Sequence, residues 1–315
     1  MKIVFAGTPV FGAATLRAIS QGRHQVSAVL TMPDRRAGRG MRNRVSPVKE
    51  LALELGVPVL QPETLKEPGF IDTLRGYSPD AIVVSAYGSF FPKVILDLPA
   101  VGCINVHASL LPRHRGASPI NQSILSGDRF SGVSIIRMTD VLDAGPVILS
   151  LATPVLPRMD VLQLHDILAV LGGKAICLAL DRLDVGVTGA AQCAGEVTYA
   201  PKLDRRYVID WSKGALELDR FVRAFGSFPG VYSTYDYKLI KILSLEPVCW
   251  IAKSFCGVPG TVLSVCRSGA VVACGDGFVR LLFLQKPGGK RLPAFEFSLG
   301  SGLAVGCVLG LGSIV

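Results

Sequence analysis

An asparagine and a histidine two residues apart are the first side chains in this sequence that could do chemistry. They are Asn105 and His107, in the segment Gly102-Cys-Ile-Asn-Val-His-Ala-Ser-Leu-Leu-Pro112, which begins with a run typical of a strand. Alternate side chains of a strand point to the same face, so the two would lie side by side. An amide that donates to an oxyanion, beside an imidazole that titrates near neutrality, suits acyl transfer.

A carboxylate that could complete this group lies 36 residues beyond His107, at Asp143. It stands in Val141-Leu-Asp-Ala-Gly-Pro146, which is typical of a turn between two strands. There the carboxylate could orient the imidazole and accept a proton. Each residue alone favours an ordinary interpretation, as a buried histidine and two turn formers. The three residues together, at a strand end, leave both interpretations open.

Five arginines within ten residues form a second group. They are Arg35, Arg36, Arg39, Arg42 and Arg44, and the only acid beside them is Asp34. Guanidinium groups suit bidentate phosphate contacts, and the interspersed glycines give flexibility that could be lost on binding. Most charge runs are solvated surface, and that alternative stays open here. The whole chain has a formal net charge of +9, which favours polyanions such as nucleic acid without identifying one.

Strands and helices alternate through the first half of the chain, where they must position both groups. Strands are predicted at Lys2–Ala6, Gln25–Thr31, Ala81–Ala86 and Cys103–Val106, and helices at Phe11–Ser20, Ser46–Leu55 and Phe70–Arg75. Ser46-Pro47 is a good helix start signal. The alternation predicts a parallel sheet covered on both faces, whose ligands bind at the carboxyl ends of its strands. Two adjacent strands, Val133–Met138 and Val147–Thr153, and a long helix at about 160–183 follow.

The texture changes at residues 184–206, which we interpret as a linker with a short strand at Val197–Ala200. A helix at about 214–225 follows. Apolar runs then recur at short intervals, at Tyr237–Leu245, Gly260–Val265, Ala270–Cys274 and Val279–Leu284. This pattern predicts a small β-sandwich or barrel. A chain of 315 residues is therefore expected to form two domains of α/β and β type.

Several functions are disfavoured by missing patterns. The turn Phe5-Ala-Gly-Thr-Pro-Val-Phe11 lacks the GxGxxG spacing, which argues against an NAD-dependent dehydrogenase and leaves an ordinary strand–helix turn. The N-terminus lacks a signal-peptide pattern, and the longest apolar run, Leu303–Val315, is too short to span about 30 Å of hydrocarbon. We therefore expect a cytoplasmic protein with no membrane role.

Metal and disulfide chemistry are disfavoured as well. The eight cysteines are scattered without a CxxC pair, so we expect no metal site and reduced, buried thiols. Outside the first group, His24 and His165 are interpreted as structural, and His114, between two arginines, as a surface residue.

The first group resembles the signature of the tetrahydrofolate-dependent formyltransferases. The resemblance is carried by Asn105-x-His-x-Ser-Leu-Leu-Pro112, by Arg113-x-Arg-Gly-Ala117 and by Leu142-Asp-x-Gly145. It implies that Asn105, His107 and Asp143 form the catalytic trio. It also implies that Ser109, Leu110, Leu111 and Pro112 contact the folate, with 10-formyltetrahydrofolate as the formyl donor and no metal.

Further segments narrow the resemblance to the members that act on methionyl-tRNA. They are Phe5–Pro9, Ala37–Gly40, Ser46–Lys49, Val84–Gly88, Thr198–Ala200 and Ile209–Trp211. The resemblance implies a Rossmann-like catalytic domain over 1–183, a linker over 184–206, and an OB-like, tRNA-binding β-barrel over 207–315. It also implies that the arginine segment wedges into the acceptor end of initiator methionyl-tRNA, and that the protein works as a monomer.

The sequence departs from the family pattern at several positions. Ala108 stands where glycine is usual, Arg36 where proline is usual, and Asp143-Ala-Gly-Pro146 lacks a neighbouring hydroxyl and carboxylate. Gly226-Ser-Phe-Pro229 also differs, and the last 25 residues have no clear counterpart. None of these changes removes a proposed catalytic residue.

Two rival functions follow from the same residues. One keeps the chemistry but takes a small acceptor, an amino-sugar nucleotide or glycinamide ribonucleotide. The arginine segment and the expected barrel argue against it. The other is a non-catalytic RNA-binding protein, which the retention of the whole trio disfavours.

Overall fold

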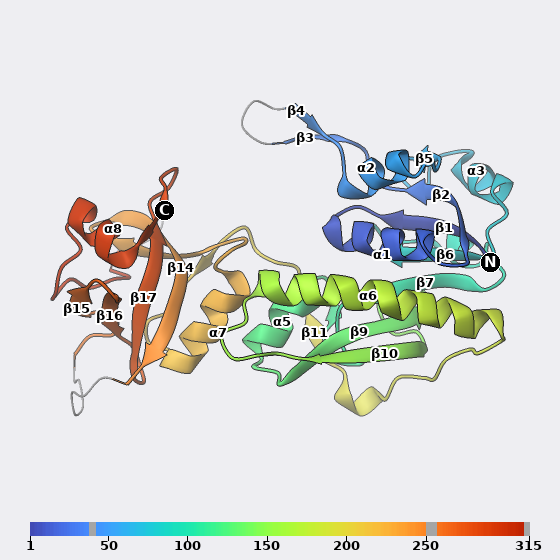
Figure 1. Cartoon of the computed structure of the whole chain (residues 1–315). Coiled ribbons are helices and arrows are strands. Elements are labelled where there is room, and N and C mark those ends of the chain that lie inside the picture. Colours follow the sequence, from blue (N-terminus) through green and yellow to red (C-terminus); the bar gives the residue numbers. More distant parts are fainter. Residues whose placement is uncertain (38–41, 250–256, 312–315) are drawn as a thin grey trace. The chain divides into compact units, whose positions relative to one another are not determined.

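Five parallel strands and two antiparallel ones form the sheet of the first unit (Figure 1). A computed structural model describes residues 1–37, 42–249 and 257–311, and their contacts separate two units. The first comprises Met1–Pro119, Phe130–Pro154 and Gln163–Pro201. Its strands are β1 (Lys2–Gly7), β2 (Gln25–Leu30), β5 (Val59–Leu60), β6 (Ala81–Ser85), β7 (Gly102–His107), β9 (Phe130–Arg137) and β10 (Val147–Pro154), in the order β10-β9-β7-β6-β1-β2-β5.

The order of these strands reverses at β1. The chain passes from β1 to β2 and β5 on one side, and returns to place β6 and β7 on the other. In such doubly wound sheets, ligands bind beyond the carboxyl ends of the strands at the point of reversal. The predicted α/β class with a Rossmann-like parallel sheet is confirmed.

The apolar character of the central strands explains their position. β6 is buried at every residue and β1 at all but its first, as expected for strands covered on both faces. The helices of this unit are α1 (Val10–Ser20), α2 (Pro47–Glu54), α3 (Phe70–Gly76), α4 (Lys93–Leu96) and most of α6 (Val161–Asp184). Helix α2 starts as predicted, since the Ser46 hydroxyl accepts from the Lys49 amide at 3.1 Å. The elements predicted for this region are confirmed. The short β5 and α4 were not predicted.

Helix α6 is the one helix in the described ranges that is long and apolar enough to cross a membrane by length and composition alone. A Cβ placed on Gly172 would lie 3.2 Å from Val106 of β7, and one on Gly173 would lie 2.9 Å from Ala18 of α1. The helix therefore packs one face closely against β7 and α1. The core helix of a globular protein can be as long and apolar as a membrane-spanning helix.

Three short strands, β3, β4 and β8, were not predicted. β3 (Arg35–Ala37) and β4 (Arg42–Arg44) form an antiparallel hairpin in which Arg35 pairs with Arg44. Arg39, with residues 38–41, lies outside the described residues, and only the backbone of the other four arginines is described. β8 (Arg115–Gly116) pairs in parallel with β11 (Tyr199–Ala200), which confirms a strand near the end of 184–206. That segment, with its turn of 3-10 helix (Ala194–Glu196), therefore belongs to the first unit up to Pro201.

The second unit is built on a separate, mostly antiparallel sheet. Its strands are β12 (Tyr207–Val208), β13 (Val231–Tyr235), β14 (Lys238–Val248), β15 (Val262–Cys266), β16 (Gly269–Ala273), β17 (Phe278–Gln285) and β18 (Arg291–Pro293). They follow the order β12-β13-β14-β17-β16-β15, with β18 on β17. Helices α5 (Pro119–Leu125), α7 (Ala215–Phe225) and α8 (Ala294–Ser301) lie in this unit.

The Gly-rich C-terminal segment joins the two open edges of this sheet. Its Leu309 amide donates to the Gly260 carbonyl at 2.9 Å, and Thr261 and Val308 form an antiparallel bridge beside β15. The next amide, that of Gly310, donates to the Thr234 carbonyl of β13 at 2.9 Å. The strands alone leave the predicted barrel open, and the C-terminal segment links its edges. A segment without clear apolar periodicity thus has a structural role.

Gly260→Ala should weaken this link. Gly260 has φ +95°, and a Cβ there would lie 2.3 Å from the Leu309 carbonyl oxygen. We expect the clash to lower the free energy of unfolding by about 1–3 kcal/mol beyond the backbone strain. Gly288→Ala is the matched control in the same unit, since Gly288 has φ +71° with open space around it. Urea unfolding followed by tryptophan fluorescence measures both, and equal losses would contradict the proposed link.

The cysteines of the described ranges carry free thiols. Cys103 and Cys274 are buried, and burial raises the pKa of Cys103 to about 12. Cys193, Cys249 and Cys266 are exposed, so the expectation of buried thiols is wrong for these three. They lie in turns and at a strand end, where an apolar residue need not face the core.

Candidate active site

Asn105, His107 and Asp143 lie together at the carboxyl end of β7, in the first unit. The Asn105 Nδ2 donates to Asp143 Oδ1 at 3.3 Å, and His107 Nδ1 lies 3.5 Å from Asp143 Oδ2. The side chains of His107 and Asp143 are only 5% and 8% exposed. Electrostatic interactions are stronger at such a buried site than in water. The two-residue spacing and the turn therefore bring the three predicted residues into one cluster.

The protonation of His107 follows from its partners. Its Nε2 lies 2.9 Å from the His114 carbonyl oxygen, and a carbonyl can only accept, so Nε2 carries a proton. Proton exchange is therefore left to Nδ1, which faces Asp143. The 3.5 Å separation is longer than a normal hydrogen bond, so Nδ1 is not fixed on the carboxylate.

The turn that carries Asp143 has an unusual backbone. Asp143 itself has φ +51°, in the left-handed region that only a few residue types enter readily. A Cβ on Gly145 would lie 1.7 Å from the Arg137 carbonyl oxygen, so only glycine fits there. The Gly116 amide donates to Asp143 Oδ2 at 2.9 Å. With Asn105 on the other oxygen, the carboxylate is held as an acceptor, as an ionised carboxylate is.

The segment Ser109–Pro112 is fixed beside the trio by Ser134. The Ser134 hydroxyl donates to the Ser109 carbonyl at 2.8 Å and accepts from the Leu111 amide at 3.0 Å. The Ser109 hydroxyl donates to the Arg113 carbonyl at 2.7 Å. Ser109 is fully buried, and its hydroxyl and carbonyl both hold the backbone of this segment. Leu110, Leu111 and Pro112 are half-buried, as a wall of a ligand site would be.

The prediction that His114 lies on the surface is wrong. His114 is 3% exposed, its amide donates to Thr198 Oγ1 at 2.8 Å, and its carbonyl orients His107. Pairing of β8 with β11 covers this residue, although it stands between two arginines. His24 and His165 have structural contacts, as predicted: His24 bonds to Asp181 and His165 packs on Phe11.

Several groups around the trio were missed by sequence reasoning. They are the His114 carbonyl, the Gly116 amide and the hydroxyls of Ser134 and Thr198. Backbone groups and lone hydroxyls have no periodic signature. The one available signal was the Arg113-x-Arg-Gly-Ala117 motif, which contains two of these groups.

The turn after β1 closes onto the end of β6. Cβ atoms on Gly7 and Gly12 would lie 2.7 and 2.8 Å from the Ser85 carbonyl oxygen. The Thr8 hydroxyl donates to the Tyr87 carbonyl at 3.0 Å. These glycines therefore serve close packing between neighbouring strand ends. Burial raises the pKa of Tyr87 to about 12, so its phenol stays protonated at neutral pH.

Two polar links join the ends of the segment that carries the arginine hairpin. Thr31 and Ser46 are hydrogen-bonded through their hydroxyls at 2.8 Å, and Lys49 Nζ lies 2.6 Å from Asp34 Oδ2. Gln61 Nε2 also donates to Asp34, at 3.0 Å. The bond from Lys49, with that from Gln61, lowers the pKa of the Asp34 carboxyl. Lys49 is thus paired with Asp34, and these bonds fix the backbone at both ends of the hairpin segment.

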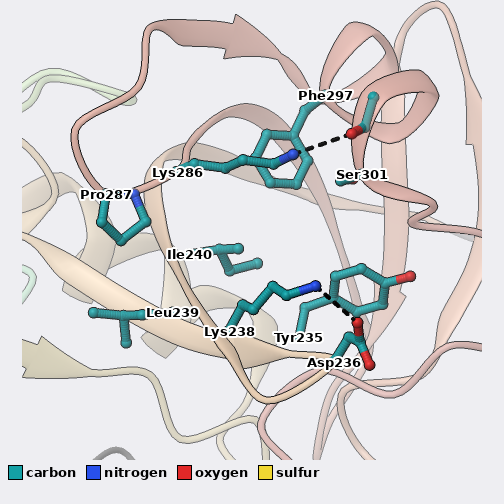
Figure 2. A pocket seen from close by; sticks show the side chains of 10 residues that line it. Tyr235, Asp236, Lys238, Leu239, Ile240, Lys286, Pro287, Phe297 and Ser301 are labelled. Carbon is teal, nitrogen blue, oxygen red and sulfur yellow. Dashed lines mark hydrogen bonds and ion pairs between the residues drawn. The ribbon is translucent and has the colours of Figure 1, made fainter.

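A separate hollow of about 440 Å³ lies in the second unit (Figure 2). Figure 2 shows Lys286 beside Phe297 and Lys238 beside Asp236. The Lys286 ammonium lies 5.6 Å from the centre of the Phe297 ring. Tyr237, at the tip of the β13–β14 hairpin, is 90% exposed and has φ +55°. Cations and aromatic rings therefore gather here, in a place that holds none of the trio.

The amide, the imidazole and the carboxylate lie at the carboxyl end of β7, two strands from the point of reversal, and their chemistry suits group transfer. Residues 1–180 match the family model for formyl transferase, and residues 204–302 match that for the formyl transferase C-terminal domain. The chain therefore belongs to the formyl transferase family.

Known relatives extend this likeness over both units. The chain is 44% identical over 307 residues to methionyl-tRNA formyltransferase of Dechloromonas aromatica (strain RCB), covering 97% of this chain and 98% of the relative. Among solved structures, an N-formyltransferase from Helicobacter canadensis in complex with folinic acid and dTDP-3-aminofucose matches with a TM-score of 0.64 at 15% identity, over 89% and 98% of the two chains. HypX from Aquifex aeolicus in complex with tetrahydrofolic acid matches with a TM-score of 0.61 at 19% identity, over 95% and 47%. At these identities the two structures show the fold alone.

Proposed function

We propose that this protein transfers a formyl group from 10-formyltetrahydrofolate to the free amine of methionyl-initiator tRNA, giving N-formylmethionyl-tRNA. The observation that carries the proposal is the similarity to a methionyl-tRNA formyltransferase at 44% identity over nearly the full length of both chains. A small-acceptor enzyme is supported only by structures under 25% identical. The Asn105, His107 and Asp143 cluster supports catalysis over mere RNA binding.

The mechanism follows from the geometry of the cluster. The methionyl amine attacks the formyl carbon, a C–N bond forms, and the carbonyl oxygen becomes an oxyanion. The second N–H of the Asn105 amide and the protonated His107 ring stabilise that oxyanion. Asp143 accepts the proton that the amine loses, directly or through water. The bond to the folate nitrogen then breaks, and His107 Nδ1 donates a proton to it.

The remaining residues are assigned to binding. Ser109, Leu110, Leu111 and Pro112 hold the folate, and Arg35, Arg36, Arg39, Arg42 and Arg44 contact the tRNA acceptor end. We assign catalysis to the domain expected over 1–183 together with residues 184–201 of the first unit, and further tRNA contact to the domain over 207–315. The protein acts as a monomer in the cytoplasm.

The direct test is a formyl-transfer assay with the purified full-length chain and 10-formyltetrahydrofolate. Initiator methionyl-tRNA, elongator methionyl-tRNA, glycinamide ribonucleotide and an amino-sugar nucleotide are offered side by side. We expect the initiator tRNA to give the highest kcat/KM. Transfer to a small amine alone would establish the first rival. Binding of tRNA with no transfer to any acceptor would establish the second.

Replacing Lys238 and Lys286 together by glutamine tests the C-terminal contact. Their ammonium groups border the hollow, and Lys238 directly follows the exposed Tyr237, which suits a phosphate next to a stacked base. We expect the KM for methionyl-tRNA to rise several-fold, and its logarithmic salt dependence to flatten by about 0.7–0.9 for each lost phosphate contact. Lys93→Gln, at an exposed lysine of the first unit, is the control. An unchanged salt dependence would remove the hollow from the tRNA contact.

A further inference from the structure

The side-chain amide of Gln192 bonds to the turn of Asp143 through its nitrogen and to Arg115 through its oxygen. Its Nε2 donates to the carbonyl oxygens of Asp143 and Gly145, both at 2.8 Å. Its Oε1 accepts from Arg115 Nε at 3.1 Å and from Nη2 at 2.8 Å. A glutamine amide has two N–H donors and two acceptor lone pairs, so every bonding position is filled. Both N–H donors of the amide are used on one turn, which indicates a role specific to that turn.

These bonds close a ring around Asp143. Arg115 directly precedes Gly116, whose amide donates to Asp143 Oδ2 at 2.9 Å. The ring therefore runs from the carboxylate to Gly116, through the Arg115 guanidinium to Gln192, and back to the Asp143 backbone. Both the side chain and the main chain of Asp143 are thus held by one connected set of groups.

The segment that carries Gln192 is itself anchored on both sides. Ala190 and Val147 exchange two backbone hydrogen bonds of 2.8 Å, at the start of β10. Further along, β11 pairs with β8, and a Cβ on Gly116 would lie 2.5 Å from the Ala200 carbonyl oxygen. The glutamine is therefore delivered to the turn from a fixed backbone.

The turn needs such support because its own packing is weak. Val141 and Leu142 are 58% and 59% exposed, so the turn buries little apolar surface there. Asp143 also holds a left-handed backbone, which persists only where the surroundings impose it. Hydrogen bonds from Gln192 to the carbonyls of Asp143 and Gly145 support it here.

We infer that Gln192 is a positioning residue for Asp143, and that Arg115 acts on the same turn through Gln192. The inference rests on the proposed function for its activity assay and goes beyond it by assigning two residues that do not touch the reacting atoms. A displacement of about 1 Å of a catalytic group can cost roughly 100-fold in rate. The carboxylate that faces His107 is therefore sensitive to the loss of this amide.

The test begins with Gln192→Glu and Gln192→Met. Glutamate keeps an acceptor for Arg115 but removes both N–H donors to the turn, whereas methionine removes every bond without adding charge. We expect kcat for methionyl-tRNA to fall about 10- to 100-fold, as for other groups that orient a catalytic ligand. The KM values for both substrates and the thermal unfolding midpoint should stay close to those of the wild type. Gln25→Glu, at an exposed glutamine of β2, is the control.

A double-mutant cycle with Arg115→Met tests whether the two residues act in series. If Arg115 acts through Gln192, the double variant with Gln192→Met should be no slower than the slower single variant. A multiplicative loss would overturn that part of the inference. Wild-type kcat in both Gln192 variants, or a kcat loss matched by a general loss of stability, would overturn the positioning role.

Hydrogen exchange of the Gly116 amide gives a readout that needs no activity. We expect this amide to exchange faster in both Gln192 variants, because the carboxylate that accepts from it is no longer fixed. Unchanged protection would overturn the inference. A wild-type chain without formyl transfer would instead refute the proposed function, and the exchange experiment would still decide about the ring.

Discussion

Replacing His107 with alanine should reduce formyl transfer by a factor on the order of 100 or more, as the loss of an acid–base group does. The imidazole ring is buried, and its Nε2–H donates to the His114 carbonyl. Nδ1 is therefore the ring atom that can exchange a proton in the reaction. Asp143→Asn should give a loss of similar size. The amide lacks the negative charge, and its NH2 group would face the Asn105 or Gly116 donors.

Single-turnover kinetics with methionyl-tRNA and 10-formyltetrahydrofolate measures these losses. Folding should change little: the His107→Ala variant loses one hydrogen bond and leaves a buried carbonyl, at a cost of about 1–3 kcal/mol. Near-wild-type turnover in either variant would sink the catalytic assignment. A collapsed fold in the His107 variant would instead support a purely structural histidine.

The sequence predicts the framework of the first unit well because its information is local. Continuous apolar runs such as that of β6 identify central strands, and Ser46-Pro47 identifies the start of a helix. The two-residue spacing of Asn105 and His107 is also local, and it placed both on one strand end. The joining of Asp143 to them needed only a turn between two strands.

The groups missed around the site depend on contacts between distant residues. Gln192 bonds to Asp143 across 49 positions, and Thr198 to the His114 amide across 84. Neither has a pattern of its own in a segment poor in periodicity. His114 was misplaced because the flanking arginines suggest solvent, whereas strand pairing with β11 buries it.

The departure at Asp143-Ala-Gly-Pro146 is tolerated because the backbone fixes this turn. The Pro146 carbonyl accepts from the Arg137 amide at 3.1 Å, and Gly145 packs against the Arg137 carbonyl. The missing hydroxyl and carboxylate are therefore not needed for the left-handed position of Asp143.

Alanine at an arginine of the β3–β4 hairpin should raise the KM for methionyl-tRNA. If Arg35, Arg36, Arg39, Arg42 and Arg44 meet phosphates, each contacting residue releases counterions, and its loss should flatten the logarithmic salt dependence by about 0.7–0.9. The KM for formyl-folate should stay unchanged, because the folate is assigned to Ser109–Pro112. An arginine that also positions the acceptor end should lower kcat, since a misplacement of about 1 Å can cost roughly 100-fold.

Initial rates in both substrates at two salt concentrations, for the five single variants, measure these effects. Arg42 is our first choice, because it follows Gly38 and Gly40 in the sequence and begins β4. Asp34 and Lys49 form an ion pair where the hairpin begins, so the loss of one arginine should leave the position of the hairpin unchanged. Arg75→Ala, at an exposed arginine paired with Asp72, is the matched control. If all five variants match that control for tRNA, the hairpin is solvated surface, and the tRNA contact belongs to the second unit alone.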